Sequence, residues 1–192
     1  MKFVYIYGTP GSRKSTLELN LRMNLGILGS KNEYPINKGI AVYGSVLYDK
    51  KPSKKNVIVK HPDWPYSRPS LDTILSDLHR IGADTFVLQG SIIPFRKEDM
   101  EKIKDNHEFI LLGNYISKAK NYRLLKNRES YEGRNTKGKV EDLRDFYGGY
   151  KKNEDILKDY SSEYARLSRC GNSRKRFIKI LETIGLNGEN IT

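Results

Sequence analysis

Residues 2–16 read KFVYIYGTPGSRKST, and this stretch decides the fold. Lys2–Tyr7 is an apolar run of β-branched and aromatic residues, which is typical of a buried strand. Gly8–Ser12 is rich in residues that favour turns. From Lys14 onward, leucines recur at the spacing of one helix face. The stretch therefore predicts a strand, a glycine-containing loop and a helix in immediate succession.

The same alternation continues along the chain. Further strands are expected at residues 39–48, 56–60, 85–88 and 108–112, with helices at 71–78 and 97–106. Strands separated by helices require crossover connections, and such connections build a parallel sheet with helices on both faces. The predicted fold class is α/β, a three-layer α/β/α sandwich with a mainly parallel sheet.

Beyond Tyr115 the pattern predicts helices and no further strands. Helices are expected at residues 116–128, 154–169 and 174–184. The segment 129–139 is polar and contains glycine, so we expect a mobile loop there. The chain, 1–192, is predicted to be one domain, with a lid and mobile loop at 116–150 and C-terminal helices at 151–192.

Composition excludes several classes of protein. The chain has 192 residues, 37% of them hydrophobic, and no apolar run reaches the roughly 18–20 residues of a membrane helix. The opening segment is short and quickly polar, so we expect no secretory signal there. The single cysteine, Cys170, excludes an intrachain disulfide and a multi-cysteine zinc site. We therefore expect no membrane partner and a reducing, cytoplasmic location.

Basic residues outnumber acidic ones, 35 to 23, which gives a formal net charge of +12. Residues 1–115 carry 17 basic and 12 acidic side chains, a net of +5, and residues 116–192 carry 18 and 11, a net of +7 on a shorter stretch. A positive electrostatic field around the protein favours a polyanionic partner, either nucleotide phosphates or a nucleic-acid backbone. Solubility alone is the alternative explanation.

The segment Gly8–Thr16, GTPGSRKST, is here termed the phosphate loop. It resembles the Walker A loop of P-loop kinases, GxPGSGKST, at every fixed position except one. The resemblance implies a P-loop fold in which backbone N–H groups and a helix N-terminus hold the phosphates of ATP. It also implies that Lys14 bridges the β- and γ-phosphates and that Ser15 binds Mg²⁺. The expected nucleotide-binding residues are Gly8, Thr9, Pro10, Gly11, Ser12, Arg13, Lys14, Ser15 and Thr16.

The departure is Arg13, which stands where the family has glycine. Glycine lets the main chain approach phosphate closely and adopt unusual dihedral angles. Three interpretations remain open. Arg13 belongs to a working, divergent loop whose guanidinium helps to hold phosphate, or it inactivates the loop, or the loop is a relic that no longer binds nucleotide.

A kinase also needs an acidic group near its metal ion and a group that orients or deprotonates the acceptor. The strand expected at 85–88 ends in Gln89, which carries no charge and is better explained as a structural residue. Asp49, after the second strand, and Asp72, in the first turn of a helix, are the candidate acidic residues, and either could orient or deprotonate an acceptor hydroxyl. Their structural alternatives are a strand-end turn for Asp49 and a favourable interaction with the helix dipole for Asp72.

Basic residues follow the last expected core strand. Arg123, Lys126 and Arg128, with Arg134 beyond them, resemble the lid of nucleotide kinases, whose arginines clamp the transferring phosphoryl group. The resemblance gives Arg123 and Arg128 a catalytic role, and a solvated helix face is the alternative. A second basic cluster suits either a nucleic-acid backbone or a plain charged surface, and its members are Arg166, Arg169, Arg174, Lys175 and Arg176.

In chain order, the phosphate loop, YGSVLYD (43–49), SLDTIL (70–75) and FVLQGS (86–91) are similar to the phage kinases that phosphorylate hydroxymethyluracil in DNA. This resemblance implies a DNA-modifying, ATP-dependent kinase with Mg²⁺, whose acceptor is a hydroxyl on a nucleotide or on a modified base in DNA. Two alternatives stay open. One is a nucleoside or nucleoside-monophosphate kinase acting on free substrate, and the other is a non-catalytic binder of nucleotide or nucleic acid.

Overall fold

A computed structural model gives the arrangement of the chain. It describes residues 1–9, 11–27, 34, 36–43, 47–48, 57–58, 70–132 and 137–186. The strands are β1 (Lys2–Tyr7), β2 (Ile36–Asn37), β3 (Ile40–Tyr43), β4 (Leu47–Tyr48), β5 (Val57–Ile58), β6 (Thr85–Gly90), β7 (Glu108–Gly113) and β8 (Glu163–Ala165). The α-helices are α1 (Lys14–Asn24), α2 (Leu71–Arg80), α3 (Lys97–Asn106), α4 (Lys118–Glu132), α5 (Lys137–Tyr160) and α6 (Ser173–Thr183), and Leu167–Arg169 forms a short 3-10 turn. Among these helices, none has the length and apolar character needed to cross a bilayer.

The main sheet has six strands in the order β2-β3-β6-β1-β7-β8. β1 lies at its centre and pairs in parallel with β6 on one side and β7 on the other. β3 and β8 extend the parallel sheet outward, and β2 is an antiparallel edge strand. The prediction of an α/β fold with a mainly parallel sheet is confirmed.

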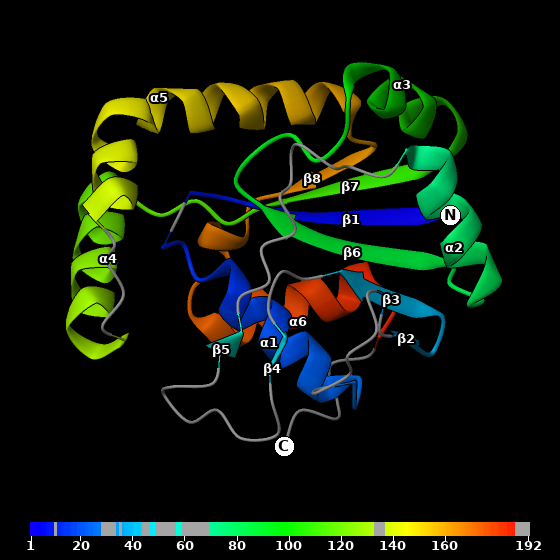
Figure 1. The fold of residues 1–192 in the computed structure, drawn as a ribbon, viewed down its shortest axis with the longest axis horizontal. Coiled ribbons are helices and arrows are strands. Elements are labelled where there is room, and N and C mark those ends of the chain that lie inside the picture. Colours follow the sequence, from blue (N-terminus) through cyan, green and yellow to red (C-terminus); the bar gives the residue numbers. More distant parts are fainter. Residues whose placement is uncertain are drawn as a thin grey trace.

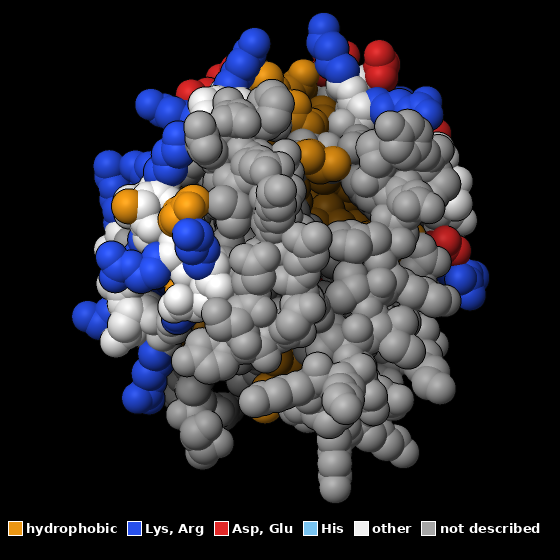
Figure 2. Space-filling model, turned by 60° about the vertical axis from the view of Figure 1, so that its left-hand side comes forward, with side chains coloured by type: hydrophobic (Ala, Val, Ile, Leu, Met, Phe, Trp, Pro, Cys, Tyr) orange, Lys and Arg blue, Asp and Glu red, His pale blue; other side chains and the backbone are white. Residues whose placement is uncertain are grey.

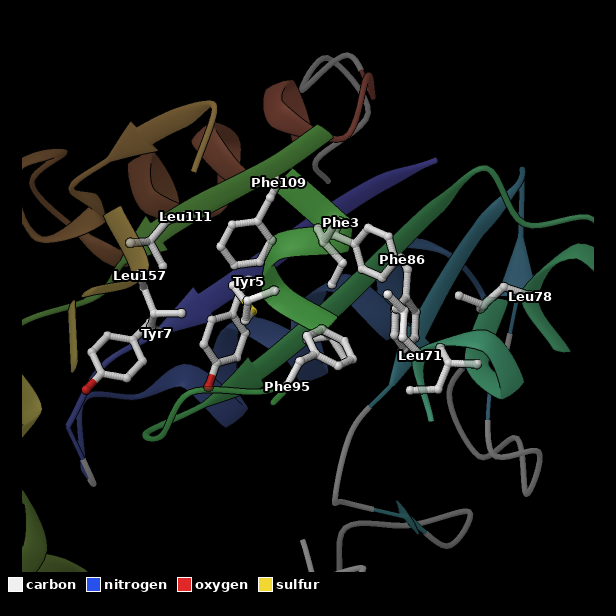
Figure 3. Close-up of a cluster of buried hydrophobic side chains, with 14 of the residues drawn as sticks. Phe3, Tyr5, Tyr7, Leu71, Leu78, Phe86, Phe95, Phe109, Leu111 and Leu157 are labelled. Atoms are coloured by element: carbon white, nitrogen blue, oxygen red, sulfur yellow. The ribbon is translucent and has the colours of Figure 1, made fainter. Parts of the chain in front are cut away.

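Helices cover both faces of this sheet (Figure 1). Successive residues of β1 point to opposite faces, so its aromatic residues, among them Phe3 and Tyr7, enter one core and Val4 and Ile6 enter the other. The first core is closed by α2, α3 and α5, and the second by α1 and α6. Figure 3 shows the first core, in which the rings from β1, β6 and β7 lie along the sheet. The result is three layers, as the sequence predicted.

The order of the strands creates a switch point beside β1. The chain leaves β1 through α1 toward β3 on one side, whereas it leaves β7 toward β8 on the other side. In open α/β sheets, ligands bind where neighbouring strands send their connections in opposite directions, outside the carboxyl ends of the strands. The residues that follow β1 and β7 therefore occupy the position where a ligand is expected, and the phosphate loop is one of these segments.

The C-terminal third differs from the sequence prediction. The expectation that strands stop after Tyr115 is wrong, because β8 pairs in parallel with β7. The helix expected at 154–169 is wrong beyond Tyr160, where α5 ends before β8 and the 3-10 turn begin. A strand of three residues is too short to produce a readable pattern, and its pairing with β7 is what makes it a strand.

Three further boundaries differ from the prediction. The segment 129–139, expected to be a polar loop, is helical at both ends, since α4 runs to Glu132 and α5 begins at Lys137. The strand expected at 39–48 is divided, with β3 in the main sheet and β4 paired with β5 in a separate two-stranded sheet. The helix α5 crosses the boundary set at residue 150, so the segment expected to begin the C-terminal helices starts inside a continuous helix.

Candidate phosphate-binding site

The phosphate loop begins at the end of β1 and is held tightly against its neighbours. The backbone N–H of Gly8 donates to the carbonyl of Gly90, at the end of β6, over 3.2 Å. A β-carbon on Gly8 would lie 2.6 Å from the carbonyl oxygen of Asn114, which follows β7. Any side chain at this position would therefore push the loop away from the strand ends. Glycine is required here because two backbones approach closely.

Lys14 is buried and points back into the loop. Its side chain is on the first residue of α1, and the residue is 7% exposed. The Nζ atom donates to the carbonyl oxygens of Gly8 and Thr9 over 2.8 and 2.9 Å. The ammonium group therefore sits inside the curve of the loop, where a positive charge can meet an anion with little screening by water.

Arg13 has a backbone conformation that favours glycine. Its φ is 68°, in the left-handed region, and it forms the N-cap of α1 without a side-chain hydrogen bond to the helix. Non-glycine residues adopt this region at a cost of roughly 1 kcal/mol or more. The residue is exposed, so its guanidinium does not fill the loop interior that Lys14 occupies. The chain therefore accommodates an arginine at this position by holding its backbone in the left-handed region, at an energetic cost.

The N-terminus of α1 lacks the usual local partners. Ser70 and Asn172 cap α2 and α6 by accepting backbone N–H groups, as expected of such residues. The first turn of α1 has neither a side-chain cap nor an acidic residue. The amides of Ser15 and Thr16 lie in this turn and cannot be satisfied by the i−4 pattern. The helix end thus offers N–H groups and a partial positive charge.

Two buried asparagines tie the loop to the rest of the fold. Asn114 Nδ2 donates to the carbonyl oxygen of Ser12 over 2.5 Å, and Asn121 Nδ2 donates to Thr9 Oγ1. All four residues are completely buried. Sequence reasoning missed both asparagines. The one available signal was the position of Asn114 directly after a predicted strand, in a Gly-Asn pair.

Arg176 completes this network from α6. Its Nη1 donates to Asn114 Oδ1 over 3.3 Å and its Nε donates to the carbonyl of Gly171 over 3.2 Å. The guanidinium therefore fixes the amide of Asn114 so that its NH₂ group faces the loop. Sequence reasoning placed Arg176 in a surface cluster, and the structure brings this one member to the phosphate loop.

The network leaves two polar atoms without partners. Within the described part of the chain, Ser12 Oγ and Asn121 Oδ1 are buried and make no hydrogen bond. A buried hydroxyl without a partner is unfavourable by about 1–3 kcal/mol, and such atoms are rare in folded proteins. Ser12 Oγ can donate to an anion that enters the loop, and this would remove the cost.

A buried ion pair lies behind the loop on α1. Glu18 Oε1 accepts from Arg22 Nε over 2.8 Å, and both side chains are almost fully buried. Burial raises the pKa of Glu18, while the charge and hydrogen bond of Arg22 and the amide of Gln89 act to lower it. Gln89, at the end of β6, therefore faces this carboxyl group. This assigns Gln89 a structural contact with an acidic group that comes from helix α1.

The other predicted acids are not brought to the loop by the described structure. Asp72 is exposed on the first turn of α2 and pairs with Lys102 of α3 over 3.5 Å. Its neighbour Leu71 lies at the opposite end of the first core from Tyr7, which directly precedes the loop (Figure 3). Asp49 lies outside the described residues, as does Pro10 of the loop.

The predicted lid residues lie on and beyond α4, the helix that stands past the carboxyl ends of the strands (Figure 1). Arg123 is exposed, and Lys126 Nζ lies 5.0 Å from the centre of the Tyr122 ring. Arg128 is in α4, but its side chain is outside the described part, and Arg134 is outside it altogether. Figure 2 shows Lys and Arg side chains gathered on one side of the face that is turned forward there.

No group of three or more His, Cys, Asp or Glu side chains suited to a metal ion occurs among the residues that the structure describes. Mg²⁺ commonly binds through substrate phosphates with few protein ligands. Ser15, half-buried in the first turn of α1, fits such a limited role.

Neither a scan against models of known protein families nor a search of curated proteins found a match to this chain.

Proposed function

We propose that this chain is an ATP-dependent phosphotransferase that holds the phosphates of the nucleotide in the phosphate loop. The acceptor we propose is a hydroxyl on a nucleotide or on a modified base in DNA. The observation that carries the proposal is the Lys14 ammonium, buried against loop carbonyls at the switch point of a parallel sheet. Ligands of α/β sheets bind at this position, and a buried ammonium there favours an anionic one.

Four features of the loop support a polyphosphate as the ligand. Lys14 supplies charge, and the uncapped start of α1 supplies N–H groups. Ser12 Oγ needs an acceptor, and Gly8 allows the backbone to approach closely. Each feature has a structural explanation alone, but an anion is the ligand that satisfies all four together.

The residues then have distinct roles. In the transfer, the bond from the γ-phosphorus to the β–γ bridging oxygen breaks, a bond to the acceptor oxygen forms, and the proton of the acceptor hydroxyl passes to solvent water. Lys14 stabilises the charge that develops on the departing oxygen, and the N–H groups of the loop hold the chain of phosphates in line. Bound Mg²⁺ would neutralise part of the phosphate charge, with Ser15 as the side chain that holds it. Arg123 and Arg128 of α4 are proposed to contact the transferring group.

The net charge of +12 favours DNA over a free nucleoside as the acceptor. In this reading the acceptor is the hydroxymethyl group of a modified pyrimidine, as in the phage hydroxymethyluracil DNA kinases that the sequence resembles. A base in a duplex has to leave the stack before its substituent can reach an active site. A kinase acting on free nucleotides is the alternative, and the two are separated by offering both acceptors.

The test is transfer of label from γ-labelled ATP, with Mg²⁺, to hydroxymethyluracil-containing DNA, unmodified DNA, free nucleosides and free nucleoside monophosphates. We expect label in the modified DNA. Lys14→Ala should abolish transfer while the fold is retained, and Lys97→Ala, which removes an exposed lysine from α3, should leave transfer unchanged.

The other outcomes are equally informative. Label in free nucleotides alone would replace DNA by the free substrate. Unchanged turnover in Lys14→Ala would remove the loop from the mechanism. Absence of both ATP binding and transfer, with DNA binding that weakens steeply as salt rises, would replace the enzyme by a nucleic-acid binder.

A further inference from the structure

Among the described side chains of helix α4, a buried one contacts the phosphate loop. The first turn of α4 is exposed at Lys118 and Lys120, and Tyr122 and Arg123 are exposed on the next turn. Asn121, between them, is completely buried and donates to Thr9 Oγ1. Hydrophobic residues are not gathered on one face of this helix. Its orientation toward the loop therefore depends on specific contacts rather than on a continuous apolar stripe.

The partner atom is on the loop itself. Thr9 directly follows Gly8, and its carbonyl oxygen accepts a hydrogen bond from Lys14 Nζ, while its side chain accepts one from Asn121. One residue thus contacts both the proposed phosphate-binding ammonium and the helix that carries the predicted lid arginine Arg123. A movement of Thr9 alters both contacts at once.

The second buried asparagine, Asn114, attaches the other half of the loop to the rest of the fold. Asn114 is held by Arg176 and holds the carbonyl of Ser12, so the far half of the loop is attached to the strand ends and α6. The near half is attached to α4 through Thr9. The loop is therefore attached on one side to the strand ends and α6, and on the other side to α4.

We propose that Asn121 is a positioning residue that couples α4 to the phosphate loop, so that occupation of the loop and ordering of the basic face of α4 occur together. The coupling rests on the proposed function for its ligand, but the link between Thr9 and Asn121 exists without one. Asn121 acts through Thr9 and does not contact the phosphates. The Oδ1 atom of Asn121 makes no hydrogen bond among the described residues, so the bond to Thr9 is the side-chain hydrogen bond through which Asn121 contacts the loop.

The first experiment needs no nucleotide. Amide hydrogen–deuterium exchange is measured on the wild type, Asn121→Ala, Thr9→Val and Thr9→Ser. We expect Asn121→Ala to speed exchange in the loop as well as in α4, and Thr9→Val to speed exchange in α4 as well as in the loop. Thr9→Ser keeps the hydroxyl and should restore the wild-type pattern. Asn127→Ala, an exposed asparagine on the same helix, is the matched control and should affect α4 alone.

The double variant Thr9→Val with Asn121→Ala then measures the coupling. If the two residues act through one bond, the second substitution adds little to the exchange change caused by the first. Changes confined to the substituted segment, or fully additive changes, would overturn the proposal because they would mean that the loop and α4 move independently.

The second experiment adds Mg²⁺ and a non-hydrolysable ATP analogue. In the wild type we expect slower exchange both at the start of α1 and in α4. In Asn121→Ala the start of α1 should stay protected, the protection of α4 should be lost, and the analogue should bind about fivefold more weakly or worse. Undiminished protection of α4 in this variant would contradict the coupling. If the analogue protects nothing in the wild type while the reciprocal effects of the first experiment hold, the coupling stands and the proposed function fails.

Discussion

Arg13 shows how one residue can look disabling in the sequence and be tolerated in the structure. Its φ of 68° lies in the left-handed region, which residues other than glycine rarely adopt. The side chain stays exposed and leaves the loop interior to Lys14. The three interpretations of Arg13 thus differ in what the arginine does to nucleotide affinity, and no longer in whether it blocks the loop.

Arg13→Gly tests this point. Glycine removes the left-handed strain but makes the unfolded chain more flexible, so we expect stability within about 1 kcal/mol of the wild type. If Arg13 weakens the loop, the variant should bind ATP at least tenfold more tightly, equivalent to about 1.4 kcal/mol. Isothermal titration gives the affinity and denaturant unfolding the stability.

The control is Lys38→Gly, because Lys38 is the other described non-glycine residue with positive φ, at 52°. It lies in the turn between β2 and β3, away from the loop, so relief of strain there should leave ATP affinity unchanged. Unchanged or weaker ATP binding in Arg13→Gly would show that the arginine supports the loop.

A second prediction at the scale of single residues concerns the titration of Glu18. Burial raises its pKa above the ordinary value of 4.5, so the folded protein holds this proton more tightly than the unfolded chain does. The stability gained from that proton is complete below the ordinary pKa and is lost as pH rises through the folded pKa. Glu18→Gln removes the titration. From about pH 4 upward, the unfolding free energy of the wild type should therefore fall relative to the variant.

The variant also loses the ion pair with Arg22, which changes its unfolding free energy by an amount that does not depend on the titration of Glu18. The informative quantity is therefore the slope of the unfolding free energy with pH. Urea unfolding at a series of pH values measures it. Parallel curves for the two proteins would mean that Glu18 titrates alike in both states.

At the scale of elements, helix α5 is the main surprise. It has 24 residues and contains Gly148-Gly149 in its interior, where both residues are exposed. Glycine is a poor helix former, and this pair obscures the helical pattern in the sequence. Tertiary contacts on the C-terminal side of the pair hold the helix. The hydroxyl of Tyr7 donates to the carbonyl of Tyr150 over 2.6 Å, and Leu157 is buried in the first core.

Gly148→Ala and Gly149→Ala should each stabilise the protein by about 0.5–1 kcal/mol, because alanine favours the helix and restricts the unfolded chain. A β-carbon at either position meets no atom within 4 Å. Thermal unfolding measures the effect. Gly171→Ala is the contrasting variant, since Gly171 has a φ of +87°, and it should lower the melting temperature. A lower melting temperature for the two α5 variants would indicate that the glycine pair is needed as such.

At the scale of the whole molecule, the sheet brings four separate parts of the chain to one place. The end of β1, the residue after β7 and the first turn of α4 meet at the phosphate loop, and the first turn of α6 joins them through Asn114. A ligand bound there contacts only the folded arrangement, so its binding free energy adds to the stability of the whole fold.

We therefore expect Mg²⁺ with ATP to raise the melting temperature, and saturation at a hundred times Kd to stabilise by about 2.7 kcal/mol. Lys14→Ala should lose this stabilisation, and Lys97→Ala should keep it. Differential scanning fluorimetry over a range of ATP concentrations measures both. An equal shift in Lys14→Ala would place ATP elsewhere on the molecule.

The sequence by itself determined the strand, loop and helix of residues 2–16, the parallel α/β architecture and the position of Lys14, since each depends on local periodicity and turn chemistry. Tertiary structure decided the rest. Asn114 and Asn121 became part of the site because the carboxyl end of β7 lies beside that of β1, a neighbourhood set by strand order. β8 exists because β7 offers it a partner, and no pattern of three residues encodes a partner so distant in the chain.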